Sequence, residues 1–360
     1  MTGYAANKFN SDPFWMFFTG PPSSAKTEIL RAMDGHENIT LISSLTPSTL
    51  ISGRTIKNKG NQSLLLKLGT GKLVVIKDFG TILSMHREAR GEIFAQLREI
   101  YDGQYSKAFG TGETISWSGK LGLLAATTPI IDKYMSVNHM LGERFLHYRV
   151  GNSNAFGVGC RAFENVLGEE VHRREFRDCM NQFLSRFDGN FTLNTREVSD
   201  IRERIVSLPI YCAHARSAVF RNRYDRSLEA MPQPEGPARL TKQFKLLAMA
   251  LTAVRDLEEI DSGVYEVVKK TAKDTLPRLR LQILEALWNL YLDDPKKWHR
   301  TKEVAMAAGM PTVTAKLKLE NLNLLRLIDR NTEGDGDKAA YTWRPSELMD
   351  RLVTTSECFA

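Results

Sequence analysis

The stretch that decides the fold is Phe14-Trp15-Met16-Phe17-Phe18-Thr19-Gly20-Pro21-Pro22-Ser23-Ser24-Ala25-Lys26-Thr27, which continues as Glu28-Ile29-Leu30-Arg31-Ala32-Met33. Its apolar start predicts a buried strand, and its final segment predicts a helix. The loop between them has the spacing and the flanking elements of a phosphate-binding loop, or P-loop. Backbone N–H groups of such a loop surround a phosphate at the positive end of the helix. The residues that we expect to bind a nucleotide are Gly20, Pro21, Pro22, Ser23, Ser24, Ala25, Lys26 and Thr27.

Two side chains of this loop have defined expected roles. Lys26 would reach the β- and γ-phosphates of ATP, and Thr27 would ligate Mg²⁺. We expect the Lys26 side chain to face solvent in the empty site. Ala25 stands where the usual pattern has glycine, so the backbone approaches a phosphate there only if its φ is negative. The alternative is an ordinary turn that happens to carry this sequence.

A second strand, Leu73–Ile76, leads to the acidic residue Asp78, which we expect to help hold Mg²⁺. P-loop ATPases usually have two successive acids here, the second of which polarises the attacking water. This chain has Lys77-Asp78 instead. Either Asp78 binds the metal and another acid activates water, or Asp78 takes the second position beside a lysine. A surface aspartate that merely closes a strand is the remaining alternative. The sequence predicts ATP binding and leaves rapid hydrolysis open.

The third predicted strand, Leu121–Ala126, ends in Thr127-Thr128-Pro129. We expect Thr128 to touch the γ-phosphate or orient water, with Thr127 as the second choice. Arg144 is a candidate finger for a neighbouring subunit's nucleotide, where it would stabilise charge on the phosphoryl group. Arg149 is the reserve, and a surface ion pair is the alternative for Arg144.

The fourth catalytic candidate is Arg239, in the first turn of the amphipathic segment after Pro237. A positive charge is mildly unfavourable at a helix N-terminus, which indicates an acidic ligand nearby. Arg239 would then fold over the same phosphates as a lid residue.

The whole chain predicts an α/β protein in three parts. Residues 1–160 would form a parallel-sheet NTPase core, 161–275 a helical lid, and 276–360 a winged helix-turn-helix. The predicted strands are Phe14–Thr19, Ile39–Leu41, Leu73–Ile76 and Leu121–Ala126. Four scattered cysteines argue against a zinc site and a disulfide framework. Without a signal-like start or a long apolar run, we expect a cytoplasmic protein with no membrane partner.

With these residues in hand, the chain resembles AAA+ ATPases that carry a β-hairpin before the third motif strand, and among them the minichromosome maintenance (MCM) helicases. The likeness lies in Pro21–Thr27, with alanine before lysine, in Ala125–Pro129 and in Glu143–Phe145. The resemblance implies ATP and Mg²⁺ as ligands, DNA as partner, and a ring of about six copies. Only 19 residues precede Gly20, so nothing corresponds to the family's N-terminal oligonucleotide-binding fold. We expect a shortened chain or a minimal relative encoded by a phage or mobile element.

DNA contacts are expected at three places. Tyr105–Lys120 predicts a hairpin whose position resembles one that MCM rings point into their channel, with Lys107 and Lys120 along a DNA backbone. Phe109 or Trp117 of this hairpin could stack on bases. For Trp117, burial in the core is at least as compatible with the sequence. The basic loop Ser52–Gly60 would add Arg54 and Lys57, or be a solvated turn. The net charge of +7 suits a polyanion without identifying one.

The C-terminal region predicts helices Leu279–Leu292, Thr301–Ala308 and Thr314–Leu327, then a wing at Asn331–Asp337. Lys316 and Lys318 on the third helix would face DNA. The wing tip is acidic, so a winged helix that binds protein is the alternative.

Together with these observations, the resemblance implies an MCM-like ATPase that oligomerises and couples ATP binding and hydrolysis to DNA translocation or unwinding in replication. The alternatives are an ATP-switched initiator or loader on DNA, and a regulatory nucleotide switch whose winged helix binds protein.

Overall fold

The computed structural model describes residues 1–53, 55–56, 60–61, 63–135, 144–151, 154–188, 199–222, 224–333 and 340–359. The chain divides into two compact units. The first contains Met1–Thr195 and Leu246–Glu258, and the second contains Arg196–Lys245 and Glu259–Ala360. Helices of the predicted lid segment fall in both units. Within the described residues, no helix has the length and apolarity that crossing a membrane requires.

The first unit is built on a five-stranded parallel sheet with the order β2-β5-β8-β1-β9. All four strands predicted from the sequence are confirmed, and β9 was not predicted. The short, continuously apolar runs form strands because the sheet buries both of their faces. The strands are β1 (Trp15–Thr19), β2 (Ile39–Ile42), β5 (Lys72–Ile76), β8 (Leu121–Thr127) and β9 (Leu146–Arg149).

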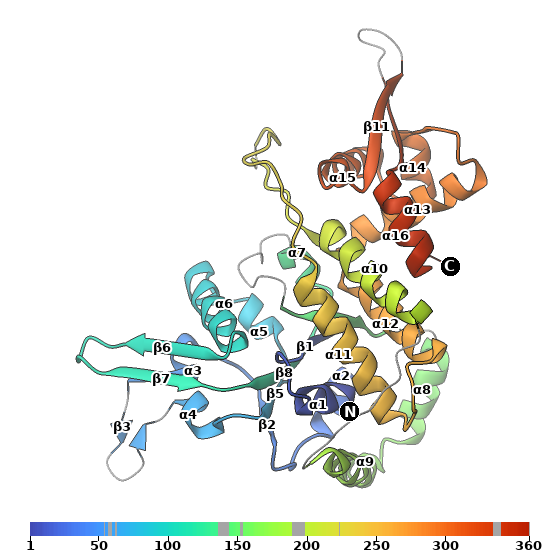
Figure 1. The fold of residues 1–360 in the computed structure, drawn as a ribbon. Helices are drawn as coiled ribbons and strands as arrows, with labels where there is room; N and C mark the ends of the chain where they lie inside the picture. The colour runs from blue at the N-terminus through green and yellow to red at the C-terminus, as the bar shows by residue number, and fades with distance from the viewer. Residues whose placement is uncertain are drawn as a thin grey trace. The chain divides into compact units, whose positions relative to one another are not determined.

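Helices cover this sheet on both faces (Figure 1). A Cβ on Gly3 would meet the Leu124 side chain at 2.7 Å, so α1 packs closely on β8. The helices of residues 1–188 are α1 (Thr2–Lys8), α2 (Lys26–Arg31), α3 (Pro47–Leu50), α4 (Leu64–Leu68), α5 (Gly80–Leu83), α6 (Arg87–Tyr101), α7 (Ile131–Met135), α8 (Ala155–Glu164) and α9 (Glu169–Leu184), followed by the 3₁₀ turn η2 (Ser185–Phe187); not all of them pack on the sheet.

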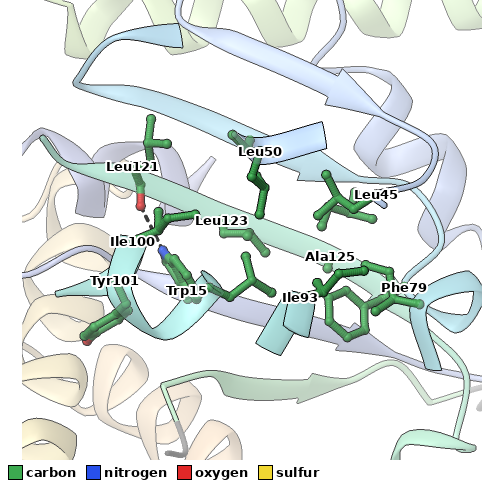
Figure 2. Close-up of a cluster of buried hydrophobic side chains, with 14 of the residues drawn as sticks. Trp15, Leu45, Leu50, Phe79, Ile93, Ile100, Tyr101, Leu121, Leu123 and Ala125 are labelled. Carbon is green, nitrogen blue, oxygen red and sulfur yellow. Dashed lines mark hydrogen bonds between the residues drawn. The ribbon is translucent and has the colours of Figure 1, made fainter. Parts of the chain in front are cut away.

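The main apolar core lies between the sheet and α3–α6 (Figure 2). Trp15 sits at its centre and is fully buried, with its Nε1–H donating to the Leu121 carbonyl at 2.8 Å. The ring of Tyr101 meets it edge-on, with centroids 5.1 Å apart. Phe17 stacks on Phe145 at 4.0 Å and fixes β9 against β1. This packing makes the sheet a rigid base for the loops at its edges.

Two short hairpins project from the first unit. One pairs β6 (Gln104–Ala108) with β7 (Thr114–Ser118), as predicted, and extends away from the sheet (Figure 1). The other pairs β3 (Thr55–Ile56) with β4 (Gly60–Asn61).

The second unit combines helices with a three-stranded antiparallel sheet of order β10-β12-β11. The predicted helices at 279–292, 301–308 and 314–327 appear as α13–α15. Strands β11 and β12 flank the predicted wing, of which residues 334–337 lie outside the described residues. The elements are α10 (Ser199–Arg216), α12 (Ser262–Thr275), α13 (Arg278–Asp293), β10 (His299–Arg300), α14 (Thr301–Ala307), α15 (Thr312–Leu324), β11 (Ile328–Glu333), β12 (Ala340–Pro345) and α16 (Glu347–Ser356). Helix α11 (Ala238–Val254) belongs to the second unit up to Lys245.

Candidate functional site

The candidate nucleotide site is the sheet edge where parallel strands end beside the loop Gly20–Ala25. Thr19, the last residue of β1, pairs in register with Thr127 of β8 and with Arg149 of β9. Asp78 follows β5, the other neighbour of β8. The fold therefore brings the predicted loop, the predicted acid and the predicted strand-end threonines to one edge, where α/β sheets bind ligands.

The loop has a backbone conformation that the sequence analysis did not anticipate. Ala25 lies in the left-handed region with φ of +59°, so the condition of a negative φ at this position is not met, and Ser23 has φ of +60°. Such a conformation turns the chain sharply into α2 at a cost of about 1–2 kcal/mol per non-glycine residue. Gly20 is needed for a different reason. A Cβ there would lie 2.8 Å from Ser24 Oγ and 3.2 Å from the Val150 carbonyl oxygen.

Lys26 lies across the inside of this loop. Its ammonium donates to the carbonyl oxygens of Gly20 at 2.8 Å and Pro21 at 2.6 Å, and to Ser24 Oγ at 2.8 Å. The side chain is only 8% exposed, so the expectation of a solvent-facing lysine is wrong. Burial lowers the pKa of Lys26, and the nearby Asp78 carboxylate opposes that shift. The loop thus holds a cation whose present partners are neutral acceptors.

Asp78 and Thr27 offer hard oxygen atoms that fit a magnesium ion. Both residues are exposed. Asp78 Oδ1 accepts the Gly80 N–H at 2.8 Å, which orients the carboxylate at the start of α5. In the described part of the chain, no group of three or more His, Cys, Asp or Glu is arranged as a metal site. Magnesium bound with a nucleotide takes most of its ligands from phosphate and water, so one or two protein oxygens suffice.

Threonine hydroxyls line the same edge. Thr128 is half-buried, and Thr127 is buried with its hydroxyl 3.4 Å from the Thr128 carbonyl oxygen. The sequence analysis did not single out Thr19, which is 1% exposed and whose hydroxyl has no hydrogen-bond partner among the described residues. A polar residue at the end of an apolar strand was the available signal.

Arg144 is held inside its own chain. It is 7% exposed, donates to Asp102 Oδ2 at 2.6 Å and lies over the Tyr101 ring. A finger acting on a neighbouring subunit would have to leave this ion pair.

Arg149 lies next to the P-loop strand. Its guanidinium forms a two-bond ion pair with Asp132 of α7, at 2.9 and 2.6 Å. Planar two-bond pairing fixes the arginine's orientation. The reserve candidate is therefore the arginine that the register places at the site, and Asp132 was not predicted.

Arg239 belongs to the second unit. Its guanidinium lies 3.9 Å from Glu235 Oε1, while Arg216 of the same unit contacts Glu235 Oε2 at 2.8 Å. The acidic partner expected at this helix start is therefore a side chain of the chain itself.

The hairpin lysines contact their own unit. Lys107 pairs with Glu92 of α6 at 2.9 Å, and Lys120 donates to the Phe9 carbonyl at 2.7 Å. Burial lowers the pKa of Lys120 to about 8. Trp117 is 5% exposed and donates to the Gly69 carbonyl at 2.7 Å, which bears out burial in the core rather than base stacking.

The hairpin tip lies near the predicted basic loop. Phe109 is half-buried, and a Cβ on Gly53 would meet its ring at 2.8 Å. The predicted DNA contacts Arg54 and Lys57 lie outside the described residues.

A cluster of cations surrounds an aromatic ring in the C-terminal part. Lys316 of α15 lies 5.5 Å and Arg330 of β11 4.7 Å from the centre of the Tyr341 ring. Lys316 and Arg330 are exposed, so this surface presents two positive charges. Lys318, two residues after Lys316, is half-buried.

Comparison of the sequence with protein-family models gave no match, and comparison with curated proteins gave none either.

Proposed function

We propose that the chain is an ATPase of the AAA+ kind, most similar to the MCM helicases, that self-associates and couples ATP binding and hydrolysis to movement on DNA. The observation that carries the proposal is the loop Gly20–Ala25 closed around the Lys26 ammonium, with Asp78 and the strand-end threonines at the same edge.

The residues of the site have separate roles in this proposal. Lys26 exchanges its neutral loop acceptors for the β- and γ-phosphate oxygens, and the loop N–H groups contact the same phosphates. Thr27 and Asp78 hold Mg²⁺, which neutralises charge on the phosphates when it is bound. Thr128, with Thr127 behind it, orients the attacking water. Arg149, at the end of β9, is the reserve candidate for stabilising charge on the phosphoryl group.

The first experiment measures ATP binding and ATPase rate with and without single-stranded, forked and duplex DNA. DNA-stimulated hydrolysis that Lys26→Met abolishes would support the motor. Absence of ATP binding by the wild-type chain would overturn the proposal at its base.

We further propose that residues 276–360 form a winged helix that binds DNA. The order α13-β10-α14-α15-β11-β12 with its three-stranded sheet supports this, and α15 then corresponds to the recognition helix. Lys316 and Arg330 around Tyr341 join helix and wing in one positive surface. Binding to duplex DNA should weaken steeply with salt, since each phosphate contact releases counterions.

Self-association is supported by an exposed apolar stripe on α8. The helix has no buried residue, and its Phe156 and Phe163 are each 85% exposed, while Leu167 just beyond it is 101% exposed. These three side chains present roughly 500 Å² at about 200 Å² per aromatic residue, over half of the ~800 Å² that each partner buries in a stable interface. Small Gly159 and exposed Cys160 lie between the two phenylalanines, so two copies of the stripe can approach closely.

A second candidate function is an ATP-switched loader or initiator that turns over slowly. The Lys77-Asp78 sequence favours it, because a lysine replaces one of two acids at the end of β5. ATP-dependent assembly with negligible hydrolysis would select this function. A regulatory switch with a protein-binding winged helix predicts the same assembly without DNA affinity.

A further inference from the structure

The segment between α10 and α11 forms a hairpin that carries an almost fully exposed tyrosine (yellow in Figure 1). Arg221 and Leu228 pair as an antiparallel bridge, and Tyr224 between them is 93% exposed. The Tyr224 N–H donates to Asn222 Oδ1 at 2.8 Å, which fixes the backbone below the ring. Tyr224 therefore presents its ring to solvent from a turn that this hydrogen bond closes.

The turn is held in a strained conformation. Arg226 lies in the left-handed region with φ of +63°. Its N–H donates to the Asn222 carbonyl at 3.1 Å, and its carbonyl accepts from Arg221 Nη1 at 2.9 Å. A non-glycine residue adopts this conformation at a cost, and such positions gather at ligand-binding sites. The strained turn fixes the Arg226 backbone two residues after Tyr224.

Arg221 also anchors the hairpin to α15 within the second unit. Its Nε donates to Asn321 Oδ1 at 2.8 Å, and its Nη2 contacts Glu320 Oε2 at 3.3 Å. The side chains of Arg221 and Glu320 are only 15% and 23% exposed. The hairpin and α15 are therefore preorganised as one surface, which reduces the entropy lost on binding.

Arg226 and Lys318 bring two positive charges to this surface, where the acids of the hairpin are Asp225 and Glu229. Lys318 of α15 is half-buried, and its pKa is lowered first by burial and then by Arg280 and Arg226. In the described part of the chain, neither Lys318 nor the Arg226 side chain forms an ion pair. The acid at the tip, Asp225, accepts from Ser227 N–H and Oγ at 2.9 and 2.6 Å.

We propose that Tyr224, Arg226 and Lys318 form a contact site for single-stranded DNA. Tyr224 stacks on an unpaired base, and Arg226 and Lys318 contact the adjacent phosphates. An exposed aromatic ring, with cations that form no ion pair on the same hairpin and on the helix that anchors it, matches a nucleotide, which joins a flat base to an anion. Bases of a duplex are already stacked on one another, so the exposed ring selects a single strand. The site rests on the proposed function only for the choice of DNA.

The test measures anisotropy of fluorescein-labelled dT20 with nucleotide-free full-length protein at several salt concentrations. Tyr224→Ala should weaken binding about 5- to 150-fold, the range for loss of one stacked base, whereas Tyr224→Phe should keep wild-type affinity. Lys318→Gln should flatten the plot of log affinity against log salt by about 0.7, one phosphate contact on a single strand. Met231→Ala is the matched control, because Met231 is 75% exposed just beyond the hairpin.

Equal binding of dT20 by wild type and Tyr224→Ala would overturn the site while leaving DNA binding by the chain intact. Equal losses for Tyr224→Ala and Met231→Ala would overturn it as well, since they would indicate a general surface effect. If wild-type protein binds no dT20, the site is wrong, whereas ATP binding and hydrolysis stand on their own assay.

Discussion

Replacement of Lys26 by methionine tests the nucleotide site most directly. Methionine keeps a chain of similar length but removes the ammonium that now bonds Gly20, Pro21 and Ser24. Two bonds from the ammonium to charged phosphate oxygens contribute about 3–6 kcal/mol, and the bonds to neutral loop oxygens that are given up offset about 2 kcal/mol of this. The net loss of about 1–4 kcal/mol corresponds to roughly 5- to 1,000-fold weaker ATP binding.

Isothermal titration calorimetry with Mg²⁺·ATP and a non-hydrolysable analogue measures this loss. Lys133→Met is the matched control, because Lys133 is an exposed lysine on α7. Circular dichroism should show both variants folded, with the midpoint of thermal unfolding of Lys133→Met within about 3 °C of wild type. A Lys26→Met protein that binds ATP within threefold of wild type would refute the placement of the phosphates.

The pH dependence of binding gives an independent check on the same lysine. Burial lowers the pKa of Lys26 in the empty site, and phosphate binding requires the protonated ammonium. As the pH is raised, ATP affinity should therefore begin to fall at a lower pH than it would if the site used an exposed lysine with its ordinary pKa of 10.5. In Lys26→Met this alkaline fall should be absent.

Three further predictions address other parts of the first unit. Asp78→Asn should lower ATP affinity at least about tenfold in Mg²⁺ but leave metal-free binding nearly unchanged, which titrations with and without EDTA compare; equal losses in both would exclude Asp78 as a ligand. Phe163→Glu should weaken self-association at least about 100-fold, since each copy loses about 1.5–3 kcal/mol of apolar burial; light scattering measures this, and bismaleimide cross-linking through Cys160 should be lost in parallel. If Phe163→Glu leaves the molecular mass in light scattering unchanged, the α8 stripe is not the surface through which copies associate. The pKa of Lys120 is about 8 in the folded chain and takes its ordinary value of 10.5 in the unfolded chain. Between pH 8 and pH 10.5 the unfolded chain therefore binds more protons than the folded chain, and the free energy of unfolding rises with pH. Lys120→Met should abolish that rise in denaturant titrations, and a persistent rise would assign it to another group.

The sequence was sufficient for features that depend on neighbouring residues. The apolar runs before Gly20 and Asp78 were correctly predicted as strands, because a doubly covered parallel sheet selects continuous apolar segments. The strand Leu146–Arg149 was missed because it contains the polar residues His147 and Arg149. It forms a strand through its parallel pairing with β1, beside the stacked rings of Phe17 and Phe145.

Features that depend on contacts between residues far apart in the chain could not be predicted from the sequence. Lys120 bonds a carbonyl 111 positions earlier, and Arg144 pairs with an acid 42 positions earlier. A basic residue near a predicted DNA channel gives no sign of such a partner. The inward pose of Lys26 was missed for a related reason, since it depends on the left-handed turn at Ala25. The Tyr224 hairpin was missed because it is held by a hydrogen bond between Arg221 and Asn321 of α15, a contact between residues far apart in the sequence.

The choice between motor and switch depends on charge at the sheet edge. Asp132 is held in a two-bond pair with Arg149, and Asp78 is the acid that acts on Lys26. Both of these carboxylates therefore already face a cation, and Lys77 adds another positive charge beside Asp78. Such an edge favours holding a polyanion, because its positive charges are fixed before the ligand arrives. Polarising water requires a carboxylate that stays free after the nucleotide binds. If ATPase assays show DNA-stimulated turnover, the Arg149–Asp132 pair is the first place to look for that carboxylate. If turnover is negligible, the lysine at the end of β5 explains it without a change elsewhere in the site.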